Sequence, residues 1–402
     1  MRRVVITGLG MISALGHNVA DSWAGLSEGR SGIGPILQVD TSKLKFGNGA
    51  EVKDFAPEKY FPGSSMDALD RFAQFAVIAA REAIQNAGLT FTPELGERTA
   101  IVTGSCVGGQ STQDEGFDAI YKKGGTRVHP LTIPKTMSNA GASHISMEFG
   151  IRGPVFSIST ACSSANHAMG QAFHMVRNGM ADVAITGGCE APFSWGLLKA
   201  WEAMRVISPD TCRPFSKDRN GMVLGEGAGM LVLETEENAR ARGAKILGEV
   251  AGFGMSSDAS HITKPSPEGA ALAMTRAMKD AKVAPEQVGY VNAHGTGTPV
   301  NDPMETAAIK VALGEHAKKV AVSSTKSMHG HGLGAAGALE AIATVVGLQT
   351  GVLPPTANYR EPDPECDLDV ITNEARKQQV EYAMSNSFAF GGLNAVLVFR
   401  AV

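Results

Sequence analysis

Ten short runs of β-branched and apolar residues alternate with longer helical patterns, and this alternation restricts the possible folds more than any other feature of the chain. Such spacing is typical of strand and helix units that build an α/β sheet with helices on its faces. The runs lie at residues 4–7, 100–103, 155–159, 183–186, 230–234, 246–251, 290–293, 320–324, 382–387 and 395–399. Helices are expected between them, for example over residues 70–86 and 270–282.

Five of the runs lie in the first part of the chain and five in the second, which predicts two similar α/β halves, residues 1–250 and residues 251–402. A chain of 402 residues is long enough for two or three structural units. No long Pro/Ser linker separates the halves, so we expect them to pack into one body with a ligand site at their junction. In each half a small-residue turn and an Ala/Gly-rich helix follow the third strand, over residues 162–176 and 331–348.

Charge and cysteine usage exclude several classes of protein. The chain has 36 basic and 40 acidic residues, a net charge of −4, which does not suggest a nucleic-acid or polybasic membrane surface. No signal-peptide core and no uninterrupted apolar run of about 18 residues is found, so no membrane span is expected. Five widely spaced cysteines without a CxxC motif disfavour a disulfide framework and a zinc cage. These features predict a reducing, cytoplasmic setting.

One cysteine lies at a predicted strand end that runs into a helix through small residues, Ser159-Thr160-Ala161-Cys162-Ser163-Ser164-Ala165. The free N–H groups and the dipole of a helix start favour a thiolate, and small neighbours permit a tight, exposed turn. Backbone N–H groups in such a turn can also face an oxyanion. A lone cysteine is more often a small buried apolar residue, so a catalytic role for Cys162 requires further evidence from other residues.

Two histidines of the second half supply that support. His294 begins the glycine- and threonine-rich loop His294-Gly295-Thr296-Gly297-Thr298-Pro299, and His331 lies in Lys326-Ser327-Met328-His329-Gly330-His331-Gly332. Both loops follow predicted strands of the half opposite Cys162. One cysteine facing two histidines suggests a nucleophile with acid–base or oxyanion donors.

Nucleotide and metal sites are weaker interpretations of the same loops. Gly8-Leu9-Gly10 follows a strand, but it lacks the third glycine and a matching acidic residue of a dinucleotide site. His329 and His331 have no acidic or thiol partner at metal-binding spacing. We therefore expect neither a cofactor nor a metal ion.

Four motifs together resemble one enzyme family. The segments around Cys162, around His294, over residues 324–337, and Asn386-Ser387-Phe388-Ala389-Phe390-Gly391-Gly392 resemble the type II β-ketoacyl-acyl carrier protein synthases, in the same order. The resemblance extends over nearly the whole chain. Within the family, His294-Gly295-Thr296-Gly297-Thr298-Pro299 and residues 354–362 look most like the nodulation protein E subgroup.

The resemblance implies the thiolase fold, with two duplicated α/β halves in a five-layer αβαβα arrangement, and a homodimer. It also implies a decarboxylative Claisen condensation, in which Cys162 receives an acyl group from an acyl carrier protein and malonyl on a second carrier supplies the attacking enolate. His294 and His331 would stabilise the negative oxygen as N–H donors. The backbone N–H groups of Cys162 and Phe390 would form an oxyanion hole.

Further positions take their expected roles from the same resemblance. Lys326 would pair with Glu340 and hold the histidine loop. Phe390 would act as a substrate gate. The other matched positions are Thr296 and Thr298 for the pantetheine arm, Val107 as a limit on acyl length, and Arg205 for carrier docking.

The chain departs from the family at several positions. Ala389 and Leu393 replace the usual Gly and Thr beside the gate, and His329 stands where Thr is common. A segment that often presents basic residues to the carrier reads Met66-Asp67-Ala68-Leu69-Asp70-Arg71.

Two alternatives remain open. A coenzyme A-dependent thiolase would use the same type of cysteine, and a chain-length-factor-like partner subunit would have the fold without catalysis. The pair His294 and His331 disfavours the thiolase, and the presence of Cys162 disfavours the partner subunit.

Overall fold

The computed structural model describes residues 2–61 and 63–402, apart from the side chains of residues 64 and 65. Its main sheet has eleven strands, and ten of them correspond to the ten predicted runs. The first half contributes β1 (Val4–Ser13), β4 (Thr99–Gly104), β5 (Val155–Ile158), β6 (Val183–Glu190) and β7 (Gly227–Thr235). The second half contributes β8 (Gly248–Ser257), β9 (Val288–Asn292), β10 (Ala321–Ser323), β14 (Tyr382–Ala389) and β15 (Leu393–Arg400).

Strand order confirms the predicted duplication. The first half has the order β5-β4-β6-β7-β1 and the second has the order β10-β9-β14-β15-β8, so the same permutation occurs twice. In both halves the three strands farthest from the junction are parallel and the last two pair antiparallel. The eleventh strand, β12 (Asp369–Val370), extends the second half beside β10. Short pairs form elsewhere: β2 (Gly34–Pro35) with β3 (Asn48–Gly49), and β11 (Val352–Leu353) with β13 (Arg376–Lys377).

The two halves share a narrow seam. Strands β1 and β8 pair antiparallel over three residue pairs, from Val4 with Val250 to Ile6 with Gly248, which makes the eleven strands one continuous sheet. The predicted domain boundary at residue 250 falls inside β8. The division into residues 1–250 and 251–402 stays a prediction, and the strand order would place it just before β8.

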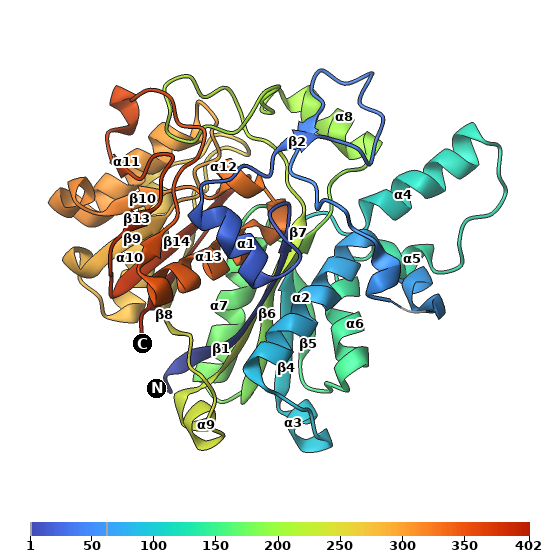
Figure 1. The fold of residues 1–402 in the computed structure, drawn as a ribbon, viewed down its shortest axis with the longest axis horizontal. Helices are drawn as coiled ribbons and strands as arrows, with labels where there is room; N and C mark the ends of the chain where they lie inside the picture. Colours follow the sequence, from blue (N-terminus) through green and yellow to red (C-terminus); the bar gives the residue numbers. More distant parts are fainter. Residues whose placement is uncertain (1, 62) are drawn as a thin grey trace.

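Helices complete five layers (Figure 1). Two central helices, α7 (Ser164–Arg177) and α13 (Ala336–Thr350), contact each other and strands of both halves. Helices α2 (Arg71–Ala87) and α6 (Ala140–Phe149) cover the outer side of the first half, and α10 (Pro267–Ala281) and α11 (Asn301–Leu313) cover that of the second. The remaining helices are α1 (Val19–Ser27), α3 (Pro93–Glu97), α4 (Gln110–Phe117), α5 (Thr132–Thr136), α8 (Trp195–Met204), α9 (Glu236–Ala241) and α12 (Lys326–His329).

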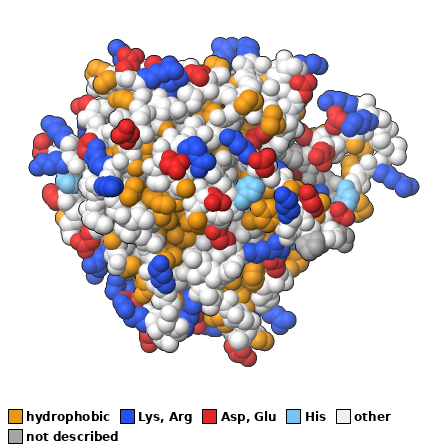
Figure 2. Space-filling model, in the orientation of Figure 1, with side chains coloured by type: hydrophobic (Ala, Val, Ile, Leu, Met, Phe, Trp, Pro, Cys, Tyr) orange, Lys and Arg blue, Asp and Glu red, His pale blue; other side chains and the backbone are white. Residues whose placement is uncertain are grey.

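Helix α13 lies in the central layer and carries small and apolar residues on nearly all sides, with Glu340 as its one charged residue. The segment Leu333–Thr350 is long and apolar enough to cross a membrane by composition, but 83% of it is buried inside the protein. Its composition is that of a core helix. On the face shown in Figure 2, basic and acidic side chains are interspersed, in keeping with the small net charge.

Pairs of glycines allow the outer helices to approach the first strand of each half. A Cβ atom on Gly10 of β1 would lie 1.9 Å from the Ala79 carbonyl oxygen of α2. At the corresponding place in the second half, a Cβ atom on Gly254 of β8 would lie 2.2 Å from the Ala273 carbonyl oxygen of α10. The glycine pair at residues 8 and 10, which follows a strand as in a nucleotide motif, is thus a helix-packing feature that the duplication repeats at residues 252 and 254.

We predict that Gly10→Ala and Gly254→Ala each destabilise the protein by about 1–3 kcal/mol or more, because the added methyl group would overlap a backbone oxygen in a closely packed layer. The shift of the urea unfolding midpoint measures the effect. Gly34→Ala is the matched control, since no atom lies within 4 Å of its added Cβ. Equal midpoints for all three variants would contradict the packing role.

Candidate active site

Cys162 lies in a tight turn between β5 and α7, two residues before the helix begins. Its neighbour Ala161 has a φ of +49°, which is a strained conformation for a residue with a side chain. Serine hydroxyls hold the turn: Ser164 donates to the Ala161 carbonyl oxygen over 2.7 Å, and Ser163 donates to that of Thr160 over 2.8 Å. The small residues that suggested a turn in the sequence thus form it.

The Cys162 side chain is only 6% exposed, but it lines a cavity of about 420 Å³ whose walls come from both halves. Burial raises the pKa of the thiol to about 12; the charge of Lys326 opposes this rise and the Glu190 carboxylate adds to it. The expectations of an exposed sulfur and a favoured thiolate are therefore wrong for the resting protein, because the cost of burying the charge exceeds the attraction of the helix start. Cys162 rests as a neutral thiol.

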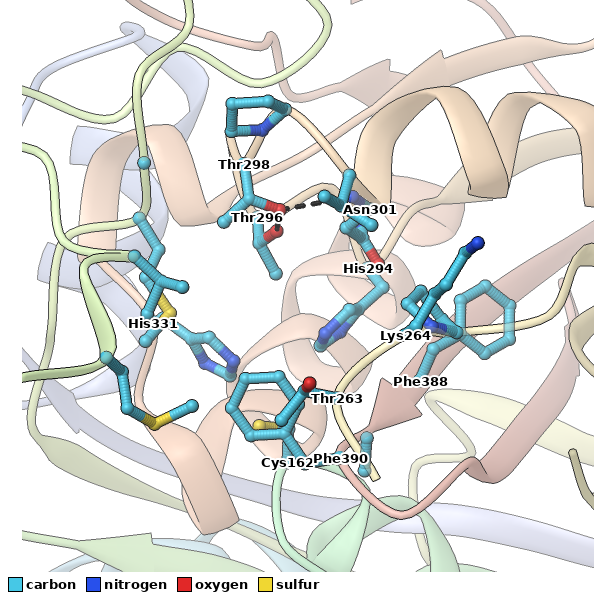
Figure 3. Close-up of a pocket in the computed structure, with 18 of the residues that line it drawn as sticks. Cys162, Thr263, Lys264, His294, Thr296, Thr298, Asn301, His331, Phe388 and Phe390 are labelled. Atoms are coloured by element: carbon cyan, nitrogen blue, oxygen red, sulfur yellow. Dashed lines mark hydrogen bonds between the residues drawn. The ribbon is translucent and has the colours of Figure 1, made fainter. Parts of the chain in front are cut away.

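His294 and His331 reach the same cavity from the second half. His294 follows the end of β9, and His331 follows α12. Their ring centroids lie 5.3 Å apart and the rings are nearly perpendicular, at 83°. Figure 3 shows both imidazoles pointing toward the space that contains Cys162 and the ring of Phe390. The fold thus brings together three side chains that the sequence suggested from separate motifs.

Hydrogen bonds fix the tautomer of each imidazole. The Lys326 Nζ lies 3.3 Å from His294 Nδ1, and an ammonium group can only donate, so that nitrogen accepts. The backbone N–H of Leu333 donates to His331 Nδ1 over 3.1 Å. Burial first, and then the charge of Lys326, lower the pKa of both histidines well below the usual value. Both rings are therefore neutral, and each carries its proton on Nε2.

Lys326 and Glu340 form an ion pair with both side chains fully buried. The Lys326 Nζ also donates to the His294 carbonyl oxygen over 2.7 Å. Burial raises the pKa of Glu340 to about 7 against the opposing effect of Lys326. The contact implied by the family resemblance is present, and it joins α12, α13 and the loop that follows β9.

A buried carboxylate that the sequence did not point to holds the His294 loop. Glu305, in the first turns of α11, accepts hydrogen bonds from the backbone N–H groups of His294 and Gly295 over 2.8 and 2.7 Å. Asn386 donates to the same carboxylate over 3.1 Å. The available signal was the acidic pair Asp302 and Glu305, three residues apart at the start of a helix. Such pairs are usually solvent-exposed.

Threonine hydroxyls face the open part of the cavity. Thr296 and Thr298 line it, and their Oγ1 atoms lie 2.9 Å apart (Figure 3). The Asn301 backbone N–H donates to Thr298 Oγ1 over 3.2 Å. Each hydroxyl can still bond a polar group in the cavity.

Phe390 lies in the turn between β14 and β15, where its ring stacks on Trp201 with centroids 6.2 Å apart. The following residues, Gly391 and Gly392, have φ of +85° and +70°. The turn is backed by a second loop, because the Gly391 N–H donates to the Ile262 carbonyl oxygen over 2.7 Å. The departures at residues 389 and 393 form the last pair of the β14–β15 hairpin.

Cations and apolar side chains surround the mouth of the cavity. Arg205, just after α8, and Lys264 both line it and are exposed. Met204, Ile262 and Val300 also line it, with side chains 40–69% exposed. The predicted carrier-facing arginine therefore lies at the entrance.

The segment of residues 66–71 offers no free cation. Arg71 pairs with the fully buried Glu226 over 2.6 Å and stacks over the Phe55 and Phe75 rings. Asp70 turns inward and accepts from the Thr112 hydroxyl over 2.6 Å. Of the six side chains, only that of Asp67 is exposed.

Val107 is not among the residues that line the cavity as it stands. Its backbone N–H donates to Glu190 Oε1 over 3.3 Å, behind Cys162. His329 is likewise outside the cavity: its Nδ1 bonds the Gly330 carbonyl oxygen and its Nε2 bonds the Thr325 hydroxyl, over 2.8 and 2.9 Å. Burial and the charge of Lys326 lower the pKa of His329 to about 3. The extra imidazole is thus a neutral part of the loop framework.

Across residues 2–61 and 63–402, no group of three His, Cys, Asp or Glu side chains is arranged to hold a metal ion. The arrangement around the cavity is that of a thiol, two N–H donors and two hydroxyls. It suits acyl transfer with stabilisation of a negative oxygen.

Comparisons with known proteins agree with this chemistry. Residues 1–239 match the family Beta-ketoacyl synthase, N-terminal domain, and residues 247–360 match the corresponding C-terminal domain. Nodulation protein E of Rhizobium leguminosarum bv. trifolii is 52% identical over 401 residues, which cover both chains completely. The 3-oxoacyl-[acyl-carrier-protein] synthase 2 of Synechocystis sp. is 44% identical over 99% of this chain and 98% of its own.

A solved structure described as a type II PKS acyl-carrier protein in complex with its ketosynthase has a TM-score of 0.90 to this chain. Its sequence is 33% identical, and the match covers both chains completely.

We predict that Lys326→Met lowers the free energy of unfolding by about 3–5 kcal/mol at pH 8, because it leaves the Glu340 carboxylate buried without its partner. The pKa of Glu340 is already raised, so stability gained by protonation grows as the pH falls. The difference from wild type should therefore be smaller at pH 6 than at pH 8 in urea titrations. Lys326→Met/Glu340→Leu should recover most of the loss; an equal loss in both variants would contradict this account.

Proposed function

The chain belongs to the β-ketoacyl synthase family, and on this premise we propose that Cys162, His294 and His331 catalyse a decarboxylative Claisen condensation of acyl groups carried by acyl carrier protein. The family membership makes the chain a ketosynthase of the type II kind, an acyltransferase-type condensing enzyme. The observation that carries the residue roles is the neutral thiol beside two imidazole N–H donors in one cavity.

In the first half-reaction, Cys162 attacks the carbonyl carbon of an acyl-carrier thioester. A bond forms between the cysteine sulfur and the acyl carbon, the carrier's thioester bond breaks, and the carrier thiol leaves with the proton that the Cys162 thiol loses. We assign the oxyanion hole of this step to the backbone N–H groups of Cys162 and Phe390.

In the second half-reaction, a malonyl-carrier thioester loses CO₂ and becomes an enolate. Its carbon forms a bond to the acyl carbonyl carbon on Cys162, and the bond between that carbon and the cysteine sulfur breaks, which gives the 3-oxoacyl-carrier product. The released Cys162 thiolate takes up a proton from water. The Nε2–H groups of His294 and His331 stabilise the enolate oxygen, and a preorganised donor of this kind contributes about 3 kcal/mol. Neutral rings suit this role, since each keeps its proton throughout.

Other residues of the family pattern take supporting roles. Thr296 and Thr298 bind the pantetheine arm with their hydroxyls. Phe390 is the gate to the acyl chamber, and its rotation would require separation from Trp201. Val107 limits acyl length in the space that opens when the gate moves. Lys326, with Glu340, positions the histidines.

The partner is an acyl carrier protein that docks at the cavity mouth. Arg205 and Lys264 would meet acidic side chains of the carrier, and the apolar ring of residues 204, 262 and 300 would contact its apolar surface. The outward-facing Asp67 weakens any docking over residues 66–71. This arrangement favours a carrier that relies less on a basic patch than the family pattern does.

We also propose a homodimer. Strand β5 ends the main sheet with an open edge, where Phe156 is 39% exposed. The segment around α4 and α5 extends away from the body (Figure 1). It exposes apolar side chains. They belong to Phe117, Tyr121, Val128, Leu131, Ile133 and Met137. A second copy of the chain would cover both surfaces.

Five free cysteines fit the cytoplasmic location that we propose.

The two alternatives have weaker support. A thiolase uses a second cysteine as base, but none of the other four cysteines, all within the described residues, lines the cavity that holds Cys162 and the two histidines. A non-catalytic partner subunit would not need the Cys162 turn or the paired N–H donors.

We predict that Cys162→Ala forms no acyl-enzyme from acyl-carrier substrate, whereas His294→Ala still loads an acyl group but releases CO₂ from malonyl-carrier about 100-fold more slowly or worse. Mass spectrometry of the protein measures loading, and labelled CO₂ measures decarboxylation. Cys366→Ala is the control for loss of a buried thiol elsewhere. Full condensation by Cys162→Ala would refute the mechanism, and a wild-type protein that never loads would favour the partner subunit.

We predict that Arg205→Glu/Lys264→Glu raises the KM for acyl-carrier about tenfold and leaves kcat within about twofold, because the reversed charges repel an acidic partner at the rim of the interface. A small acyl thioester without carrier should react at the wild-type KM. Lys245→Glu/Lys319→Glu, which reverses two exposed cations that do not line the cavity, is the charge-matched control. If that control raised the KM equally, the docking assignment would be wrong.

A further inference from the structure

Three backbone segments meet behind Cys162, and each has a glycine at the contact. A Cβ atom on Gly104, at the end of β4, would lie 2.5 Å from the Ala165 nitrogen of α7. A Cβ atom on Gly188 of β6 would lie 2.5 Å from the Gly334 carbonyl oxygen, and one on Gly334 would lie 2.4 Å from the Cys106 nitrogen. The loop that follows His331 therefore packs directly against the first half, with backbone touching backbone.

The Glu190 carboxylate, at the end of β6, joins these segments and is fully buried. Its Oε2 accepts from the backbone N–H groups of Cys106 over 2.6 Å and Gly334 over 2.9 Å. Its Oε1 accepts from the Ser105 hydroxyl over 3.0 Å and the Val107 N–H over 3.3 Å. One carboxylate thus bonds the loop of residues 105–107 and the loop that contains His331.

We propose that Glu190 is a positioning residue that couples the acyl-length loop of residues 105–107 to the oxyanion donor His331. The inference rests on the proposed function, in which Val107 limits acyl length and His331 stabilises the enolate. Gly334 lies three residues after His331, and Leu333 between them donates to the His331 ring. A displacement of residues 105–107 by a long acyl chain would therefore be transmitted through Glu190 to the imidazole.

The charge of Glu190 has a second effect on the site. It raises the pKa of the Cys162 thiol, whereas the charge of Lys326 lowers it. Burial raises the pKa of Glu190 itself, and its hydrogen bonds oppose that rise. The Glu190 carboxylate accepts hydrogen bonds from four donors. If it became protonated, the added proton would displace at least one of these donors. Glu190 and Lys326 thus shift the pKa of the Cys162 thiol in opposite directions.

Gly334→Ala tests the coupling by steric means. Its added methyl group would overlap the Cys106 backbone and Glu190 and push the His331 loop away from them. The substitution adds no strain from a positive φ, since Gly334 has none. Gly332→Ala is the matched control in the same loop, because the nearest atom to its added Cβ is 3.5 Å away. Glu190→Gln is the second variant: its amide oxygen can keep Cys106 and Gly334, but the Val107 N–H loses its acceptor and the charge is removed.

For Gly334→Ala we expect the kcat of malonyl-carrier decarboxylation to fall about tenfold with an unchanged KM, together with a shift in the chain length of the products. Gly332→Ala should stay within about twofold of wild type. Glu190→Gln should shift the product lengths and raise the iodoacetamide labelling rate of Cys162 at pH 8 about threefold, because a nearby negative charge is gone. A purely structural role would lower the thermal midpoint without these changes.

Wild-type decarboxylation and wild-type product lengths in both Gly334→Ala and Glu190→Gln would overturn the proposal. If Gly334→Ala does not fold, Glu190→Gln alone decides it, through product length and labelling rate. The wild-type protein distinguishes the two possible failures. If the wild type loads and condenses but both variants behave like it, only the coupling through Glu190 is wrong. If the wild type itself does not condense, the proposed function is wrong.

Discussion

The site depends on one buried positive charge. The Lys326 ammonium group pairs with Glu340 on the central helix α13 and donates to both the carbonyl oxygen and the ring of His294. Because it can only donate, it sets the tautomer of that ring. Its charge adds to burial, which is the larger cause, in lowering the pKa of His294 and His331. The same charge is the main influence that opposes the raised pKa of Cys162. A surface lysine could do none of this, since water would screen it.

The duplicated topology explains why the candidate catalytic groups come from both halves. In each half, the third strand leads into a central helix: β5 leads through Cys162 into α7, and β10 leads through α12 and His331 into α13. Since α7 and α13 pack together between the half-sheets, the two equivalent helix starts lie close to one another. The halves differ in what they contribute to the cavity: the first supplies the thiol and the second supplies the N–H donors. Neither half alone contains the complete cavity.

Several buried carboxylates hold loops in place through hydrogen bonds to backbone N–H groups. Three glutamates, Glu190, Glu226 and Glu305, each accept hydrogen bonds from backbone N–H groups of loop residues. Each is fully buried, and burial raises the pKa of each. A carboxylate with several donors holds loop backbone that has no sheet or helix partner. The sequence alone does not show that these glutamates are buried, because an isolated Glu is usually exposed.

The sequence alone determined the ten strands and the duplication, and it pointed to the three candidate catalytic side chains, because hydrophobic periodicity and small-residue turns are local properties. It also identified the pair Lys326 and Glu340 through the family pattern. Only the tertiary structure decided the protonation of Cys162, the inward turn of Arg71, the framework role of His329 and the convergence of donors on Glu190. These depend on burial and on contacts between residues far apart in the chain, and burial reverses the expected charge of a group when desolvation outweighs a local dipole.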